Sequence, residues 1–203
     1  MTPPRPGGPI VHIFADESCL GNQFGDRPRP GAAAGLIERF DERKGWHRRD
    51  FRHFDADTTN NRMAIFSGIV GLGALRRPCR VVFTSDSQYL VKGIREWVHG
   101  WARRGWKRKG GDIENLDLWK RLVRTAARHE IEWRWVRGHD DHVKNEYANW
   151  LAVETANTGP GADGIEPSGF EAWLAANREK GRYEDFLDIP DTAFAPGPPP
   201  PAL

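Results

Sequence analysis

The chain has little of what marks a secreted or membrane-bound protein. Its 203 residues include only two cysteines, Cys19 and Cys79, which cannot form a disulfide framework. No apolar run approaches the roughly 20 residues that span a bilayer, and the opening MTPPRPGGP lacks the apolar core of a signal peptide. We therefore expect a cytoplasmic protein with no membrane partner, whose cysteines are reduced and packed as small apolar side chains.

The chain also lacks a large excess of either sign of charge, since the net charge is only +2. Its distribution is uneven: residues 92–109 hold seven Lys or Arg and one Glu, a local charge of +6, so the rest of the chain carries −4. Such a block indicates a polyanionic partner. A solvated face with no partner is the alternative that composition leaves open.

The order of predicted elements gives the fold class. Runs rich in β-branched and aromatic residues predict strands at 10–14, 31–40, 46–54, 80–84 and 130–136, the second and third forming an antiparallel hairpin. Apolar periodicity and capping residues predict helices at about 60–75, 87–95, 97–104, 115–127 and 143–155. The chain is thus expected to be an α/β protein with a mixed five-stranded sheet flanked by helices.

Composition also divides the chain into three parts. Residues 1–9 are expected to be a disordered lead, 10–156 the folded domain, and 157–203 a Gly/Pro-rich extension ending in APGPPPPAL. Within the extension, 168–180 could form a short helix presenting Phe170, Trp173 and Leu174. That helix could dock on its own domain or bind a protein partner, or the segment could be disordered. We otherwise expect a monomer.

Two aspartates mark the expected site. Asp16 and Asp86 each follow a strand that is predicted to be buried. If these strands are parallel neighbours, both carboxylates lie at one edge of the sheet, where burial is costly unless a cation receives the charge. Paired carboxylates without a Cys/His cluster favour a hard cation such as Mg²⁺. The alternative is that each Asp caps the turn or helix after it.

Six motifs in the same order and spacing resemble the type 1 ribonuclease H family over residues 10–156. They are DESCLGN (16–22), TTNNRM (58–63), SDSQYLVKGI (85–94), WVHGWARRGWKRK (97–109), NLDLW (115–119) and WVRGHDDHVKNEYANWLA (135–152). The resemblance implies an RNase H-like fold with strand order 3-2-1-4-5. It also implies cleavage of the RNA strand of RNA–DNA hybrids by two divalent metal ions, leaving 5′-phosphate and 3′-hydroxyl ends.

The resemblance assigns roles to individual residues. Asp16 would bridge both metals, Asp86 would hold the metal that activates the attacking water, and His139 would help to move protons and release product. Asn22, Asn60 and Gln88 would meet the minor groove, where a protein can sense the RNA 2′-hydroxyl. Contacts to phosphates would come from basic residues of the 92–109 block. These are Lys92, Arg103, Arg104, Lys107 and Arg108. Trp97, Trp101 and Trp106 are expected to form the core of this projection.

Two positions depart from the family pattern. A catalytic glutamate should follow NNRM, where this chain has Ala64, and an aspartate should stand in the last helix, where it has Asn149. An amide oxygen can still ligate a hard cation, so Asn149 remains a candidate metal ligand, whereas Ala64 offers nothing. With two carboxylates in place of four, Mg²⁺ should bind less tightly and Mn²⁺ should be the better substitute.

Other carboxylates could compensate for the missing pair. Glu17 adjoins Asp16, but neighbouring residues of a strand face opposite sides of the sheet, which argues against it. Asp140 and Asp141 lie beside His139 on a loop that could move toward the metals. Without compensation, the alternative function is a protein of the same fold that binds RNA–DNA hybrids without efficient cleavage. A scaffold acting through the extension is a third class.

Overall fold

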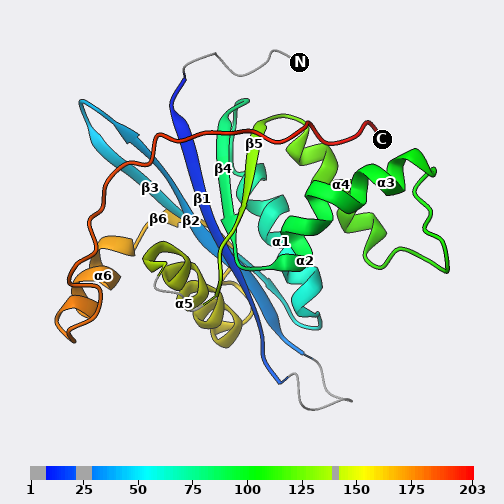
Figure 1. The fold of residues 1–203 in the computed structure, drawn as a ribbon. Helices are drawn as coiled ribbons and strands as arrows, with labels where there is room; N and C mark the ends of the chain where they lie inside the picture. The colour runs from blue at the N-terminus through cyan, green and yellow to red at the C-terminus, as the bar shows by residue number, and fades with distance from the viewer. Residues whose placement is uncertain (1–7, 22–28, 139–141) are drawn as a thin grey trace.

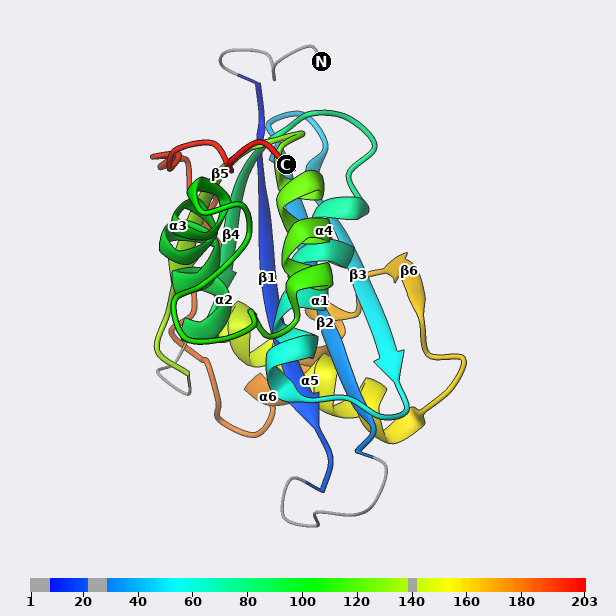
Figure 2. The same ribbon diagram turned by 90° about the vertical axis from the view of Figure 1, so that its right-hand side faces the viewer.

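A mixed β-sheet with helices on both faces forms the centre of the protein (Figure 1). The computed structural model describes residues 8–21, 29–138 and 142–203. Within them the sheet has six strands in the order β5-β4-β1-β2-β3-β6. Figure 2 shows α1 and α4 in front of the sheet, with α5 and α6 behind it. None of the described helices is long and apolar enough to cross a bilayer.

The strands follow the predicted runs, except that β1 continues to Cys19, past the end predicted before Asp16. They are β1 (Ile10–Cys19), β2 (Gly31–Asp41), β3 (Gly45–Asp55), β4 (Arg80–Ser85), β5 (Glu130–Trp135) and β6 (Gly164–Pro167). The β2–β3 pair is the predicted antiparallel hairpin. β1 runs antiparallel to β2 and parallel to β4, which places it at the centre of the sheet, as its apolar sequence indicates.

The helices also lie where the sequence predicts them. They are α1 (Asn60–Gly73), α2 (Gln88–Lys92), α3 (Val98–Arg103), α4 (Leu116–Ala126), α5 (Val143–Thr158) and α6 (Phe170–Arg178). Thr59 caps α1, because its side chain accepts a hydrogen bond from the amide of Arg62. A π-helical turn, η1 (Gly93–Trp97), joins α2 to α3. Gly93 is required there, since a Cβ atom would lie 2.1 Å from the indole of Trp119.

Each face of the sheet has its own hydrophobic core. On the α1 and α4 side, Ile13 and Phe83 pack with Trp119, and the three tryptophans of the projection pack against the same cluster, as predicted. On the α5 side, the fully buried Tyr147 and Phe170 pack together. Burying side chains of this size contributes roughly 1.5–3 kcal/mol each.

The predicted strand count of five is wrong by one. The order 3-2-1-4-5 is present, but β6 adds a sixth strand by pairing antiparallel with the outer edge of β3, from Arg49–Pro167 to Arg52–Gly164. The four residues of β6 have no alternating pattern, so nothing in their own sequence predicts a strand. They become one because the edge of β3 offers unpaired backbone groups.

The extension folds onto the domain beyond β6. In α6, Phe170 and Leu174 are buried against α5, so this apolar face is covered by the chain itself. The following residues (red in Figure 1) cross the strands. The carbonyl of Asp191 accepts a hydrogen bond from His12 Nε2 at 2.9 Å, and the amide of Gly197 donates to the carbonyl of Ile131 on β5 at 3.1 Å. The extension thus contacts the sheet from β3 to β5.

Replacing Phe170 with Ala should lower the free energy of unfolding by about 3–5 kcal/mol, because the side chain is fully buried between α5 and the extension. The measurement is urea denaturation followed by tryptophan fluorescence and by circular dichroism. Ile165→Ala in β6 is the matched control, since Ile165 is 42% exposed and should cost less than about 0.5 kcal/mol. Equal, small losses in both variants would show that the extension is not part of the cooperative unit.

Candidate active site

Two neighbouring parallel strands bring Asp16 and Asp86 together. In the register of β1 and β4, Ala15 lies opposite Ser85, which is the last residue of β4. Asp16 directly follows Ala15 and Asp86 directly follows Ser85, so both aspartates lie at the same edge of the sheet, as predicted. β1 continues to Cys19, so from Asp16 onward it has no partner on the β4 side.

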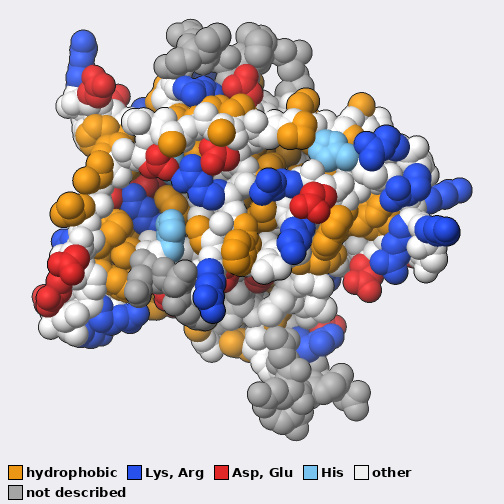
Figure 3. Space-filling view, in the orientation of Figure 1, with side chains coloured by type: hydrophobic (Ala, Val, Ile, Leu, Met, Phe, Trp, Pro, Cys, Tyr) orange, Lys and Arg blue, Asp and Glu red, His pale blue; other side chains and the backbone are white. Residues whose placement is uncertain are grey.

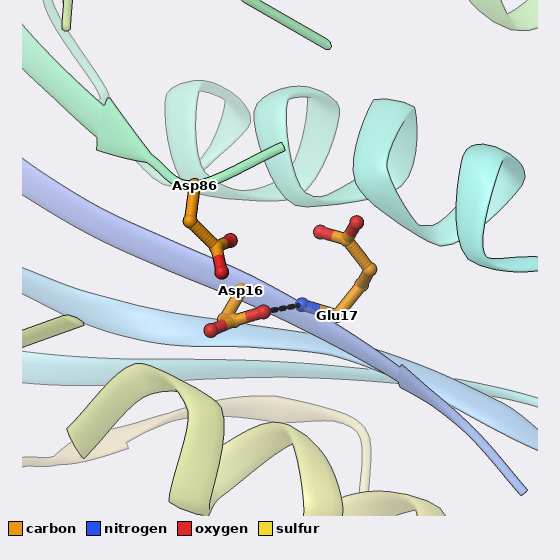
Figure 4. A group of neighbouring side chains, drawn as sticks. All are labelled: Asp16, Glu17 and Asp86. Atoms are coloured by element: carbon orange, nitrogen blue, oxygen red, sulfur yellow. Dashed lines mark hydrogen bonds between the residues drawn. The ribbon is translucent and has the colours of Figure 1, made fainter. Parts of the chain in front are cut away.

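Glu17 joins the two aspartates. One carboxylate oxygen from each of Asp16, Glu17 and Asp86 lies within 4.8 Å of the other two (Figure 4). Asp16 points toward α5 and Glu17 toward α1, on opposite sides of β1, and the Asp86 carboxylate lies beside them. The side chains do alternate, but the prediction that alternation would keep Glu17 away is wrong. Because β4 ends before this point, side chains from both faces reach the space beside Asp86.

Both substituted family positions lie on helices that flank this edge. Ala64 is fully buried in α1, the helix toward which Glu17 points. Asn149 is half-buried on α5. The edge therefore holds three carboxyl groups rather than the two expected from Asp16 and Asp86 alone.

Burial and mutual repulsion dominate the electrostatics. Burial, and then the charge of Asp86, raise the pKa of the Asp16 carboxyl well above its usual value of 3.8, although the amide of Glu17 donates to Asp16 Oδ1 at 2.7 Å. Burial, and then the charge of Asp16, raise the pKa of Glu17 well above 4.5. Glu17 Oε2 is buried and has no hydrogen-bond partner among the described residues. An all-oxygen donor set of this charge fits a hard divalent cation.

Two residues that the sequence did not single out hold the aspartates. On α5, Asn145 is 4% exposed, and its Nδ2 donates to Asp16 Oδ2 at 3.4 Å. Trp135, at the end of β5, donates from Nε1 to the backbone carbonyl of Asp86 at 2.9 Å. For Asn145, the available sequence signal was an asparagine one helical turn before Asn149 on the same face of the predicted helix. No sequence pattern distinguishes Trp135 from the other tryptophans.

The expected substrate-binding residues are partly described. Asn60 and Gln88 are the exposed first residues of α1 and α2. Asn22, His139, Asp140 and Asp141 lie outside the described residues, so their expected roles stay predictions.

The basic block forms an exposed projection. All seven cations of this block are exposed. They include the five expected phosphate contacts, on α2, at the end of α3 and in the loop after it: Lys92, Arg103, Arg104, Lys107 and Arg108. Figure 3 shows Lys and Arg side chains gathered at the right-hand end of the molecule, over α3. The arrangement offers a cationic surface at one end of the molecule.

Sequence comparison identifies relatives of the domain. The model of the RNase H family matches residues 9–157. A Ribonuclease H from Syntrophotalea carbinolica is 46% identical over 151 residues, which cover 74% of this chain and 93% of that protein. A Ribonuclease HI from Shewanella oneidensis is 43% identical over 152 residues, covering 74% of this chain and 90% of that protein.

Structural comparison agrees. The crystal structure of LC9-RNase H1, described as a type 1 RNase H with the type 2 active-site motif, has a TM-score of 0.84 and 45% identity, and the match covers 95% of this chain and 94% of that one. The PFV RNase H domain, at 14% identity and a TM-score of 0.57, shares the fold; the match covers 74% of this chain and 95% of that domain. The chain therefore belongs to the ribonuclease H family, as a type 1 member.

Proposed function

We propose that the chain cleaves the RNA strand of RNA–DNA hybrids with two divalent metal ions, leaving 5′-phosphate and 3′-hydroxyl ends. The observation that carries the proposal is the convergence of Asp16, Glu17 and Asp86 at one edge of an RNase H sheet. The family depends on divalent metal, and this carboxylate cluster is where such ions fit. Mg²⁺ is the proposed metal, with Mn²⁺ as the better substitute.

Glu17 takes the place of the carboxylate that the family pattern has at position 64. It points toward α1, the helix that carries Ala64 (Figure 4). The description of LC9-RNase H1 as a type 1 enzyme with a type 2 active-site motif supports a changed carboxylate set within this fold. Asp140 and Asp141 are then not needed as substitutes.

Asp16, Glu17 and Asp86 would hold the metal ions, and the amide oxygen of Asn149 could complete the set. When bound, divalent ions stabilise the charge that develops on the scissile phosphate and lower the pKa of the attacking water. Glu17 Oε2, which has no hydrogen-bond partner among the described residues, would accept a hydrogen bond from that water or from a 2′-hydroxyl. His139 is proposed to move protons and assist product release.

Substrate recognition is proposed to use two surfaces. Asn22, Asn60 and Gln88 would contact the minor groove and its 2′-hydroxyls. The projection would contact phosphates through Lys92 and the four cations at and after the end of α3. Binding of hybrids without cleavage is the other candidate function. Its basis is the loss of the two family carboxylates at Ala64 and Asn149, and Glu17 would replace one of them.

Glu17→Ala should abolish most cleavage of a labelled RNA–DNA hybrid in Mg²⁺. The loss should exceed the roughly 10–100-fold expected for an outer partner of a metal ligand, because a direct ligand is removed. Adding Ala64→Glu to this variant should recover part of the activity, since the carboxylate then returns from the α1 side. Wild-type protein that is inert in Mg²⁺ and in Mn²⁺ would favour the binding-only function, and full activity in Glu17→Ala would refute the role of Glu17.

Removing metal should make stability fall as pH rises. The pKa of the Glu17 carboxyl is raised in the folded state, so this state holds its proton above the pH at which the unfolded chain has lost it. Above 4.5, the ordinary pKa of this carboxyl in the unfolded chain, keeping the Glu17 proton lowers the free energy of unfolding by about 1.4 kcal/mol per pH unit. The loss stops when the pH passes the raised pKa of the folded state. In EDTA, Glu17→Gln should therefore be more stable than the wild type at pH 7 in thermal denaturation.

Mg²⁺ is the control for this measurement. It should raise the midpoint of the wild type more than that of Glu17→Gln, because it binds the charged site of the folded state. Parallel pH profiles for the two proteins in EDTA would contradict the assigned electrostatics.

Neutralising Arg103, Arg104, Lys107 and Arg108 to Gln should weaken hybrid binding and flatten its salt dependence. Each lost phosphate contact removes roughly 0.7–0.9 from the slope of log affinity against log salt. Binding is measured by fluorescence anisotropy in metal-free buffer at several salt concentrations. Arg76→Gln with Arg77→Gln is the control, since both arginines are exposed and lie outside the projection. An unchanged slope in the fourfold variant would show that the projection is only a solvated face.

A further inference from the structure

A closed ring of four alternating charges joins the extension to the domain. Glu38 of β2 and Asp188 of the extension each pair with both Arg48 of β3 and Lys144 of α5. Arg48 Nε lies 2.8 Å from Glu38 Oε2, and Lys144 Nζ lies 2.9 Å from Asp188 Oδ1. The side chains of Glu38, Arg48 and Lys144 are all less than one-tenth exposed. Each charge therefore has two neighbours of opposite sign in the ring. Arg48 Nη1 also pairs with Glu171 of α6 at 2.7 Å, but that carboxylate is largely exposed.

The ring ends beside the active site. Lys144 lies in the first turn of α5, and the next residue is Asn145, whose amide donates to Asp16. The backbone amide of Asn145 also donates to the carbonyl of His142 at 2.8 Å, at the start of the helix. The first turn of α5 is thus held by its own cap and by the ring, and it presents one buried side chain to a metal-binding carboxylate.

Asp188 is the member of the ring that the RNase H family match does not include. That match ends at residue 157, and the S. carbinolica and S. oneidensis relatives align over 151 and 152 residues. Without Asp188, Arg48 keeps Glu38 and the exposed Glu171 as partners, whereas Lys144 keeps only Glu38 within the ring. The orientation of α5 at Asn145 then loses one of its supports.

We infer that the C-terminal extension is a positioning element of the active site, acting from Asp188 through Lys144 and the first turn of α5 to Asn145, which orients Asp16. The inference rests on the proposed function only in that Asp16 is taken to bind metal. Asn145 is a positioning residue, because its amide touches a carboxylate and not the substrate. A small displacement of such a carboxylate is costly, since catalysis depends on the placement of reacting groups to within about 1 Å.

The test compares single variants in the full chain. Asp188→Asn removes the charge, and Asp188→Glu keeps it. Asn145→Ala removes the donor to Asp16. Asp163→Asn is the matched control, because Asp163 pairs with His53 at 2.9 Å and joins the same extension to β3 rather than to α5. Leu122→Ala is the control for stability, since it opens a cavity in the other core, away from α5.

Three quantities are measured where all variants remain folded: kcat and KM for a hybrid, Mn²⁺ affinity by electron paramagnetic resonance, and hydrogen exchange of the amides of 145–148. We expect Asp188→Asn to lower kcat by about 2- to 30-fold with KM unchanged, to weaken Mn²⁺ binding and to speed exchange. Asp188→Glu should recover most of these losses, while Asp163→Asn and Leu122→Ala should keep the wild-type kcat. Combined with Asn145→Ala, Asp188→Asn should cost little more than Asn145→Ala alone, because both act on one path.

Several results would overturn the inference. They are wild-type kcat and Mn²⁺ affinity in Asp188→Asn or in Asn145→Ala, additive losses in the double variant, or equal losses in Asp163→Asn. If the wild type cleaves in neither metal, the proposed function falls separately. The inference is then judged on Mn²⁺ affinity and exchange, and equal values in Asp188→Asn and Asp163→Asn would refute it.

Discussion

The repulsion among three carboxylates at the end of a buried strand is the constraint on which the site depends. Asp16 and Glu17 are adjacent on β1, the central strand, which is paired on both sides up to Ala15, so the sheet prevents them from moving apart. Burial raises the pKa of both. Ionising all three carboxyl groups is therefore unfavourable without a cation, and this is the property that makes the edge a candidate metal site.

Charges elsewhere in the described interior are balanced differently. The ring of Glu38, Arg48, Lys144 and Asp188 places each carboxylate between two cations, so it needs no ligand. The sheet edge holds three carboxylates with amide donors from Glu17 and Asn145. Both clusters contain buried acids, but cations neutralise the carboxylates of the ring, whereas the carboxylates of the sheet edge adjoin one another and accept hydrogen bonds from amide groups. A structural charge cluster and a candidate binding site differ in this way.

Position 64 illustrates that a carboxylate can reach the same place in space from another element of the fold. The type 1 pattern brings its glutamate from α1, and this chain has a buried Ala64 there. Glu17 brings a carboxylate to the same edge from the neighbouring strand, because its side chain is longer than that of Asp16 and leaves β1 on the α1 side. The fold tolerates the exchange, since β1 and α1 lie against each other.

The sequence by itself determined the order of the strands and helices, because each depends on local periodicity and capping, and it predicted that Asp16 and Asp86 lie at one edge of the sheet. Asp16 lies within β1 rather than after it, since β1 continues to Cys19. It also indicated the projection, whose charge is contiguous. Only the tertiary structure decided that Glu17 joins the site, since this depends on β4 ending opposite Ala15. It likewise decided β6, the Asn145 contact and the charge ring, because their partners lie far apart along the chain and isolated polar residues carry no periodic signal.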